Sequence, residues 1–421
     1  MKKIAVVGTG ISGLTCAYLL SREHQATVFE RNDYIGGHTA TVDVGVNGAG
    51  NGQSYAIDTG FIVFNDRTYP NFEKLMATLG VESMPTQMSF SVQNTHSGLE
   101  YNGHTLTTLF AQRRNLLNPR FWCFLWEILR FNAHCKKIHT AGNYPVGNLG
   151  QFLGQAGYSE FFAMHYIMPM GAAIWSASIN DMRAFSLQFF IRFFHNHGLL
   201  NITDRPRWYV LKGGSRSYIP GLTAPFADNI RLSTPVKAIR REQQSIVVTT
   251  DKQGEERFDD IVLACHSDQA LAMLEDASPA EQDILADMSY QDNEVVLHTD
   301  TGLLPKRPAA WASWNYRMDS DCNRPASITY NMNILQRLPA DAPVFCVTLN
   351  QSELIDPNKI LRRFSYAHPV FNEKSMAAAQ RKQEICGRNR TYFAGAYWYS
   401  GFHEDGVRSA LDVCEKFGAR L

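Results

Sequence analysis

The chain lacks the features that mark membrane-spanning, disulfide-stabilised or nucleic-acid-binding proteins. It has no run of about 18 uncharged apolar residues, so we expect no spanning helix. Its eight cysteines form no Cys-x-x-Cys pair, which excludes a zinc ribbon or a thioredoxin-type site and favours a reduced, cytoplasmic protein. Lys plus Arg and Asp plus Glu number 40 each, whereas nucleic-acid-binding proteins usually carry a basic excess. We therefore expect no nucleic-acid partner.

Metal-binding and secretion signals are also missing from the sequence. The 13 histidines show no His-Glu-x-x-His spacing and no neighbouring cysteine pair, so we expect no metal site. The N-terminus runs directly into a glycine motif without a cleavage site, so we expect no secretory signal. What is present is a chain of 421 residues, 45% of them hydrophobic, which predicts an ordered protein of two or three domains.

The first 30 residues predict a dinucleotide-binding unit. A buried strand, a glycine motif, a helix and a second strand follow one another as Ile4–Val7, Gly8-Thr9-Gly10-Ile11-Ser12-Gly13, Leu14–Arg22 and Ala26–Glu30. Gly8 permits the tight turn, Gly10 the approach of a pyrophosphate, and Gly13 close packing of helix on strand. The helix N-terminus offers N–H donors to phosphates, and Glu30 is placed to accept from ribose hydroxyls. An acid at this position disfavours NADP.

The next segment carries a family resemblance. Glu30-Arg31-Asn32-Asp33-Tyr34-Ile35-Gly36-Gly37-His38-Thr39 resembles the signature of the flavin-containing amine oxidase superfamily, which includes phytoene desaturases and protoporphyrinogen oxidase. The glycine pair of that family lies over the pyrophosphate and flavin of FAD. The resemblance therefore implies FAD contacts from Arg31, Gly36, Gly37, His38 and Thr39. The family usually has Arg at the position of His38, which leaves that phosphate contact open.

Later segments extend the resemblance in the order of the family. Residues 58–64 resemble the turn beside the flavin ring, 234–239 the strand that pairs with adenine, and 260–266 the strand that returns to the cofactor. Residues 392–407 resemble the segment along the ribityl chain, and the helix Arg408–Phe417 follows. The resemblance implies FAD contacts from Asp58, Thr59, Gly60, Phe61, Val236, Ala264, Gly395, Glu404, Asp405, Gly406 and Val407. Glu404 and Asp405 fit equally well as acids that begin a helix.

The resemblance implies an α/β fold: a Rossmann-like FAD-binding domain of the amine-oxidase type with a second α+β substrate domain made of a mixed sheet and a helical segment. We expect residues 1–70, 205–270 and 386–421 to form a discontinuous FAD-binding domain. Residues 71–204 and 271–385 then form the substrate-binding domain. Strand-like runs at 294–299, 328–333 and 344–350 favour a sheet that covers a pocket over the flavin.

Four residues are candidates for catalysis: Lys212, Tyr397, Tyr399 and His403. Lys212-Gly213-Gly214 resembles a family loop in which a lysine often holds a water at the flavin N5, although an exposed turn fits equally well. Tyr397 and Tyr399 would share one side of a strand and form a wall of the pocket. His403 and His266 are acid or base candidates by location alone. Residues 392–405 contain no cysteine of the kind that attaches FAD in some members, so we expect noncovalent FAD.

Residues 110–200 form an unusual segment with 18 aromatic residues, eight Lys or Arg and three acidic residues. Aromatic and basic side chains on helices suit an anionic membrane surface, which would place the protein on the inner face of the membrane. A helical core rich in phenylalanine, with its basic residues in solvent, is the more common meaning of such a pattern. Both interpretations stay open.

These observations predict an FAD-dependent oxidoreductase that removes a hydride from an apolar small molecule. The resemblance extends to a bacterial FAD/NAD-binding amine-oxidase-like branch associated with fatty acid modification, which implies desaturation of a lipid or fatty acyl chain. A flavin amine oxidase acting on a small amine is the first alternative. A flavin-binding protein without catalytic turnover is the second.

Overall fold

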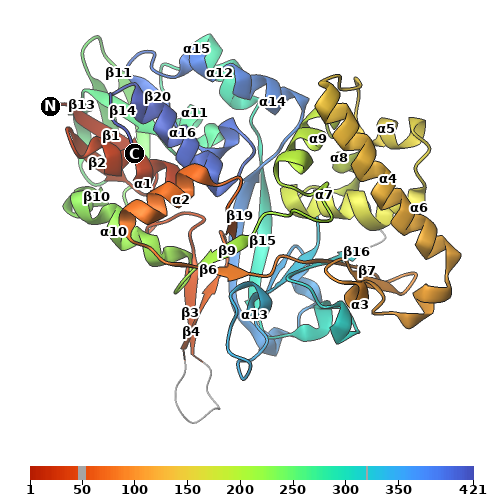
Figure 1. The fold of residues 1–421 in the computed structure, drawn as a ribbon. Helices are drawn as coiled ribbons and strands as arrows, with labels where there is room; N and C mark the ends of the chain where they lie inside the picture. The colour runs from red at the N-terminus through yellow and green to blue at the C-terminus, as the bar shows by residue number, and fades with distance from the viewer. Residues whose placement is uncertain (46–53, 319–320) are drawn as a thin grey trace.

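A computed structural model describes residues 1–45, 54–318 and 321–421. Figure 1 shows both chain ends beside a parallel sheet, two long strands through the centre of the molecule, and a lobe of helices on the far side. Among the described residues, no helix is both long enough and apolar enough to cross a membrane.

A parallel sheet of five strands forms the part of the molecule that contains both termini. Its order is β10 (Ile230–Arg231), β2 (Gln25–Phe29), β1 (Lys3–Val7), β14 (Asp260–Leu263) and β20 (Thr391–Phe393). In the centre of the sheet, Val6 of β1 is paired with Val28 on one side and with Val262 on the other. Strands from three distant parts of the chain therefore form one sheet, as expected for a Rossmann-like domain.

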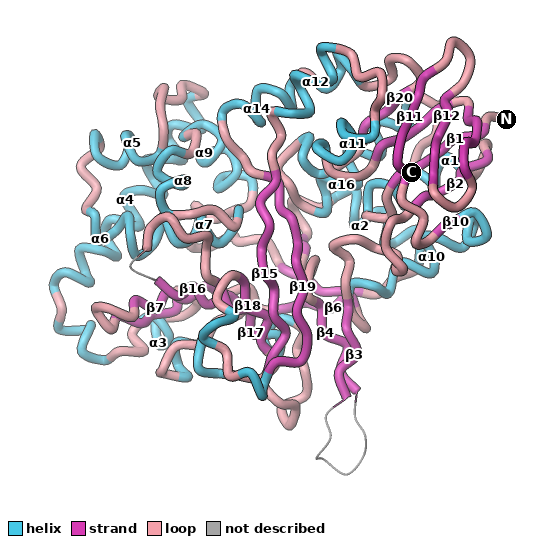
Figure 2. The backbone as a smooth tube through the Cα atoms, turned by 180° about the vertical axis from the view of Figure 1, so that it is seen from behind, coloured by secondary structure: helices cyan, strands magenta, loops and turns pink. Residues whose placement is uncertain are grey.

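A mixed sheet of seven strands forms the second layer. Its order is β19 (Ile360–Pro369), β15 (Tyr290–His298), β18 (Cys346–Leu349), β17 (Ile328–Asn331), β16 (Trp314–Met318), β7 (Phe90–Asn94) and β8 (Leu99–Asn102). Figure 2 shows β15 and β19 as the two long central strands. The strand predicted over 328–333 ends at Asn331, because the Asn331 side chain accepts from the N–H of Ile334 and begins a helix there.

Shorter strands complete the sheets. A hairpin pairs β3 (Thr41–Gly45) with β4 (Ser54–Asp58), and three strands pair in the order β5 (Phe64–Asn65), β9 (Trp208–Leu211) and β6 (Ser83–Thr86). A third group is β11 (Val236–Arg241), β12 (Ile246–Thr250) and β13 (Gly254–Phe258). Together with the two larger sheets, these strands give the α/β fold with a mixed-sheet second part that the sequence predicts, and the fold class is confirmed.

The aromatic segment forms the helical lobe. Its helices are α4 (Pro119–Ala141), α5 (Leu149–Gln155), α6 (Glu160–Phe162), α7 (Met168–Trp175), α8 (Ile179–Ala184) and α9 (Leu187–Asn196), with a π-helical turn over Ala163–Ile167. Phe131 lies at the centre, with its ring 5.4–6.3 Å from the rings of four aromatic neighbours: Phe152, Tyr158, Phe162 and Phe190. Most of the segment's aromatic side chains are therefore core.

The remaining helices lie around the two larger sheets. They are α1 (Ile11–Leu20), α2 (Pro70–Leu79), α3 (Leu106–Leu109), α10 (Ile219–Thr223), α11 (Ser267–Met273), α12 (Pro279–Ala286), α13 (Met332–Leu335), α14 (Glu373–Gln380), α15 (Lys382–Ile385) and α16 (His403–Glu415). The last helix begins five residues before the predicted Arg408, because Asp405 accepts from the N–H of Phe402 and caps the first turn.

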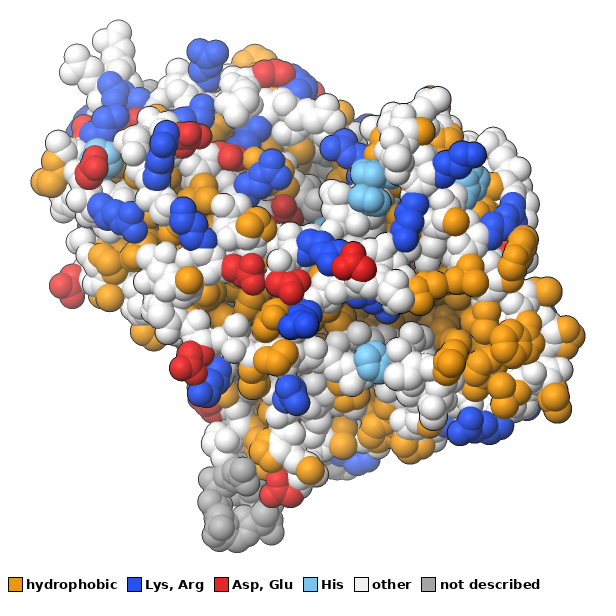
Figure 3. All heavy atoms as spheres, viewed as in Figure 1, with side chains coloured by type: hydrophobic (Ala, Val, Ile, Leu, Met, Phe, Trp, Pro, Cys, Tyr) orange, Lys and Arg blue, Asp and Glu red, His pale blue; other side chains and the backbone are white. Residues whose placement is uncertain are grey.

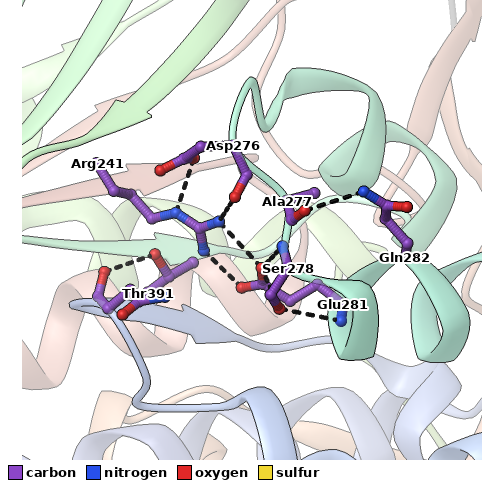
Figure 4. Close-up of polar contacts among 8 residues, drawn as sticks. Arg241, Asp276, Ala277, Ser278, Glu281, Gln282 and Thr391 are labelled. Atoms are coloured by element: carbon purple, nitrogen blue, oxygen red, sulfur yellow. Dashed lines mark hydrogen bonds and ion pairs between the residues drawn. The ribbon is translucent and has the colours of Figure 1, made fainter.

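A buried ion pair fastens β11 to α12. The Arg241 guanidinium donates to both carboxylate oxygens of Glu281, at 2.6 and 3.0 Å, and also binds Asp276 (Figure 4). The side chains of Arg241 and Glu281 are 4% and 2% exposed. Ile284 of α12 and Ala378 of α14 lie in the same core as β1 and β14, although both helices fall within the predicted substrate-binding domain. The two-domain division stays a prediction.

Candidate functional site

A cavity of about 1700 Å³ opens between the five-stranded sheet, the mixed sheet and the lobe. Typical small-molecule pockets measure about 300–1,000 Å³, so this cavity is large enough for two small-molecule ligands at once. We call the lining from the five-stranded sheet and its loops the cofactor side. We call the lining from residues 85–104, 166–208, 314 and 330 the substrate side.

The first glycine loop gives the cofactor side its shape. Gly8 has φ +103°, in the left-handed region that favours glycine. A Cβ on Gly13 would lie 2.0 Å from the carbonyl oxygen of Gly8, so the helix packs on the loop with no room for a side chain. A Cβ on Gly10 would meet no atom within 4 Å, because Gly10 faces the cavity. The loop thus leaves open the space that a pyrophosphate requires.

The N-terminus of α1 faces the same space. Gly10 begins the helix without a side-chain cap, and Ile11 and Ser12 line the cavity. Uncapped N–H groups at a helix N-terminus attract anions through hydrogen bonds and the helix dipole. This end of the cavity therefore fits the phosphates of a dinucleotide.

Glu30 ends β2 at the cavity. It is 6% exposed, and its Oε2 accepts from the backbone N–H and the hydroxyl of Thr9, at 3.0 and 2.6 Å. Its Oε1 accepts from the N–H of Asn32 at 2.9 Å. These bonds fix the carboxylate at the edge of the cavity, where its remaining lone pairs can accept from ribose hydroxyls.

The second glycine loop completes the cradle. Gly36 and Gly37 have φ of +124° and +58°, and a Cβ on Gly37 would lie 3.3 Å from Cα of Gly10. The two glycine loops, 26 residues apart in sequence, therefore touch through their backbones. Arg31, Val236, Ala264 and Gly395 also line the cavity, as the resemblance implies. The residues present fit FAD.

His38 stands where the family usually has arginine. Its ring is buried and bonds the carbonyl of Ala367, while Nε2 has no partner among the described residues. Burial holds the pKa of His38 below its ordinary value, so the ring is neutral. An arginine here would present a permanent charge to a phosphate, whereas His38 is neutral and its unpaired Nε2 is buried.

Two further histidines lie beside His38. The ring centroids of His266 and His368 are 6.3 and 5.5 Å from that of His38, and His266 stacks on Tyr290 at 4.1 Å. Burial lowers the pKa of His266 to about 4 and that of His368 to about 3. The three rings are neutral near pH 7, and no group in the described part of the chain has the arrangement of a metal site.

The sequence reasoning missed His368 and its neighbour Tyr366, whose hydroxyl lies 3.0 Å from that of Thr59. Both line the cavity from β19. Their i, i+2 spacing on a strand places both side chains on one face, and this spacing is the signal that could have found them. Nothing local in the sequence shows that β19 lies against the glycine loops.

His403, in the first turn of α16, lines the cavity and is held on two sides. Its ring stacks on Phe61 with centroids 3.8 Å apart, and Nε2 lies 2.9 Å from the hydroxyl of Tyr218 and 3.2 Å from that of Thr39. Burial lowers the pKa of His403 to about 3, so it is neutral. Thr39 itself does not line the cavity, but positions this ring. Gly60 and Phe61 do line it.

The four residues after His403 do not line the cavity. Glu404 accepts from the N–H groups of Asn71 and Phe72 and caps α2. Asp405 accepts from the N–H groups of Ser400 and Phe402, and burial raises its pKa to about 7. Gly406 lies against α1 and Val407 is buried, so the four residues cap helices or pack α16 on its neighbours.

Asp58 and Thr59 lie behind the lining. Asp58 accepts from Thr41 at 2.6 Å and from the N–H of Ser215 at 2.8 Å, and burial raises its pKa to about 6.

Lys212 is exposed and pairs with Glu82 at 2.8 Å, outside the lining.

Tyr397 and Tyr399 do not lie on one side of a strand. Residues 396–398 form a 3₁₀ turn instead of a strand, so the predicted alternation is wrong. Tyr397 lines the cavity with a hydroxyl that has no partner among the described residues. Tyr399 donates to Asp412 at 2.5 Å and lies outside the lining.

The substrate side is mainly apolar and aromatic. Its apolar lining includes Met88, Phe90, Tyr101, Tyr166, Met170, Ile174, Trp175, Phe193, Leu199, Ile202, Trp208, Trp314 and Tyr330. The lysine, arginine and acidic residues among its described lining are two arginines, Arg205 and Arg207, both exposed at the surface. The carboxylates of the described cavity lining are Glu30, Asp268 and Asp292, and none of them belongs to the substrate side. Figure 3 shows the surface hollowed between the lobe and the sheets.

Comparison with known proteins identifies the family and the fold. The profile of a family described as flavin containing amine oxidoreductase matches residues 11–306. No curated protein matches the chain in sequence. Three solved structures resemble it over nearly their whole length. Putrescine oxidase bound to putrescine is 13% identical with a TM-score of 0.70, covering 100% of this chain and 99% of that one. Cyclohexylamine oxidase from Brevibacterium oxydans IH-35A is 15% identical with a TM-score of 0.68, covering 99% of each chain, and the CLA-producing fatty acid isomerase from P. acnes is 15% identical with a TM-score of 0.67, covering 99% of this chain and 98% of that one. At these identities the likeness shows the fold.

Proposed function

This chain belongs to the family of flavin containing amine oxidoreductases, and from that premise we propose that it removes a hydride from an apolar substrate, a lipid or fatty acyl chain. The family makes the protein an FAD-dependent oxidoreductase. The choice of substrate class is our own and rests on the substrate side of the cavity.

The observation that carries the proposal is the charge of that side. The substrate side offers no carboxylate among its described lining to neutralise an ammonium group, and its two charged side chains, Arg205 and Arg207, repel a cation. Its apolar side chains suit an acyl chain. Arg205 and Arg207 at the surface are placed to pair with a carboxylate or phosphate head group.

The roles of the chain's own residues follow from their places. The two glycine loops, the N-terminus of α1 and Glu30 would hold FAD, which supplies the acceptor for a hydride when bound. The rings of His38, His266 and His403 are neutral and add no charge to the cavity. The aromatic walls exclude water from the reacting carbon.

We also propose that FAD is bound without a covalent link. Cys386 and Cys414 are buried and lie outside the lining. Cys265 lines the cavity, but burial raises its pKa to about 12, so it stays a thiol and is a poor nucleophile. Acid precipitation of the yellow protein should release the flavin into the supernatant. Flavin retained in the pellet would contradict this.

The test of substrate class is anaerobic reduction of the bound flavin. Fatty acids or phospholipids dispersed in a non-ionic detergent are mixed with the holoenzyme, and the loss of flavin absorbance is followed. Simple amines are tested separately. Reduction by acyl substrates and not by amines is expected. Reduction by amines alone would overturn the proposal.

A variant sharpens this test. Ile174→Trp narrows the substrate side without touching the glycine loops, so we expect reduction by a long acyl chain to slow at least about tenfold while FAD content stays unchanged. Leu354→Trp, at an exposed site outside the lining, is the matched control and should behave as wild type. Equal rates in both variants would place the substrate elsewhere.

Amine oxidation is the second candidate. Aromatic side chains also line the cavity near Gly395, where the ring centroids of Tyr290 and Tyr397 are 6.4 Å apart. Aromatic faces attract ammonium groups. Two of the similar structures are putrescine oxidase and cyclohexylamine oxidase. Hydrogen peroxide formed from a simple amine would identify this activity. A flavin that no substrate reduces would instead indicate a binding protein without turnover.

A further inference from the structure

Helix α4 is apolar on two faces. Phe121, Phe124 and Phe131 point into the core and are fully buried. On the other face, Trp122, Trp126 and Leu129 are 50%, 59% and 51% exposed. Their spacing of four and three residues places the three side chains in one stripe along the helix. A helix that packs only against its own core needs no second apolar stripe.

The stripe continues onto the preceding segment. Leu106, Leu116 and Leu117 are 77%, 44% and 90% exposed, and the indole N–H of Trp122 donates to the carbonyl of Leu116 at 3.0 Å. This bond fixes the turn at 113–117 against α4. We call these six residues, Leu106, Leu116, Leu117, Trp122, Trp126 and Leu129, the apolar patch. Figure 3 shows hydrophobic side chains gathered on this part of the surface, beside the hollow that leads into the molecule.

Basic residues share the segment that carries the apolar patch. Residues 103–141 carry six Lys or Arg, all at least partly exposed: Arg113, Arg114, Arg120, Arg130, Lys136 and Lys137. The one acid of this segment, Glu127, is buried and accepts from the N–H and hydroxyl of Ser159. The next acid along the chain, Glu160, pairs with Arg183. The surface that the segment presents is therefore apolar and positively charged.

The apolar patch adjoins the cavity. His104 lines the cavity two residues before Leu106, and both are exposed. Ile202, in the segment after α9, is 59% exposed and also belongs to the lining. A surface that covered the patch would thus lie at the entrance to the substrate side.

We propose that an anionic phospholipid bilayer docks on the apolar patch and brings the entrance of the cavity to the lipid surface. Exposed tryptophan and leucine in a segment with basic residues match the interface of such a bilayer, where indoles sit at the head groups and Lys or Arg contact anionic lipid. The positive charge of residues 103–141 complements the anionic head groups of such a bilayer. The inference rests on the proposed acyl substrate, and gives it a route into the cavity.

Flotation of the holoenzyme with vesicles tests the proposal. We expect binding to vesicles of phosphatidylcholine with phosphatidylglycerol, weaker binding to phosphatidylcholine alone, and loss of the difference at high salt. No binding to the anionic vesicles would overturn the proposal. Equal binding to both kinds of vesicle would overturn its electrostatic part.

Variants separate the apolar from the basic contribution. Trp122→Ser with Trp126→Ser should weaken binding at least about tenfold, whereas Leu354→Ser with Leu361→Ser, exposed apolar sites elsewhere, should leave it unchanged. Arg113→Gln with Arg114→Gln should weaken it about 25-fold, since each basic side chain contributes about fivefold, or about 1 kcal/mol.

The charge control is Lys374→Gln with Lys252→Gln, two exposed lysines outside the segment, and it should bind as wild type. If that control weakens binding as strongly as the arginine variant, the attraction is that of the whole surface and the proposal fails. If the wild type forms dimers without vesicles and the tryptophan variant does not, the patch binds a second copy and the proposal fails.

Failure of the docking surface and failure of the acyl substrate give different results. Flotation needs no turnover, and the detergent-dispersed acyl substrate reduces the flavin without a bilayer. Reduction without flotation would overturn the docking surface alone. Flotation without reduction by any acyl substrate would overturn the proposed function and leave the surface in place.

Discussion

The two sides of this molecule are held by different kinds of contact. In the part that contains the five-stranded sheet, backbone lies against backbone at Gly13, and a buried ion pair joins Arg241 to Glu281. In the helical lobe, aromatic side chains such as Phe131 pack against one another. Packed backbone and a buried pair of charged side chains cannot shift to accommodate a change. Apolar side chains packed against one another can adjust. We therefore expect the first part to tolerate substitution less well than the lobe.

The largest effect is expected for Gly13→Ala. The new Cβ would meet the Gly8 carbonyl at 2.0 Å, and alanine's better helix propensity, worth about 1 kcal/mol, cannot offset that clash. We expect loss of FAD from the purified protein and a destabilisation on the order of 5 kcal/mol or more, measured by flavin absorbance and urea unfolding.

Gly154→Ala is the matched change in the lobe. Gly154 lies in α5, and a Cβ there meets no atom within 4 Å. This variant should be as stable as wild type or more stable by about 0.5–1 kcal/mol. Equal losses of unfolding free energy in Gly13→Ala and Gly154→Ala would contradict the expected difference between the five-stranded-sheet part and the lobe.

The next effect is expected for Glu281→Ala. It leaves the buried Arg241 guanidinium without its bidentate partner (Figure 4), which costs about 3–5 kcal/mol of unfolding free energy. Glu160→Ala breaks an exposed pair with Arg183 in the lobe and should cost less than about 1 kcal/mol. Chemical unfolding of both variants measures the comparison, and a small loss for Glu281→Ala would show that water reaches the guanidinium.

The two faces of α4 sharpen the comparison within the lobe. Phe124→Ala leaves a cavity among fully buried rings and should cost about 3–5 kcal/mol. Trp126→Ala, four-tenths buried on the opposite side, should change stability by about 0.5 kcal/mol or less. Thermal unfolding measures both. A large loss for Trp126→Ala would mean that the exposed stripe serves the fold and not a partner.

The smallest effect is a dependence on pH that comes from His298 in the mixed sheet. Its Nδ1 accepts from the N–H of Asp300 and Nε2 contacts Thr348, and burial lowers its pKa to about 4 from an ordinary 6.5. Between these values the unfolded chain binds a proton that the native chain does not. Stability should therefore fall as the pH falls from 6.5 to 4, by about 1.4 kcal/mol per pH unit from this group.

His298→Gln keeps a donor and an acceptor and should show a shallower fall of stability over that pH range. His96→Gln, at an exposed site, is the control and should follow the wild type. Urea unfolding at several pH values gives the slopes. Parallel slopes for wild type and His298→Gln would show that His298 is protonated in the native protein.

Short-range patterns pointed to several residues that line the cofactor side. The glycine loop, the strand before it and Glu30 lie within 30 residues, and their geometry depends on backbone conformations that the sequence itself dictates. The family resemblance added Gly36, Gly37 and Gly395, which line the same cavity. Predictions for Lys212 and Tyr399 remain untested as chemistry, but both lie outside the lining.

The amino-acid sequence by itself determined the fold class, the dinucleotide loop and the family, because each rests on local conformation or on motifs of adjacent residues. The tertiary structure decided what long-range packing decides: that β19 brings Tyr366 and His368 to the glycine loops, and that Asp405 caps α16 outside the cavity. It also decided that both tryptophans of α4, Trp122 and Trp126, face solvent. Helical periodicity gives two apolar stripes there, and only the packing of α4 against the other lobe helices and against Tyr101 of β8 selects the one that is buried.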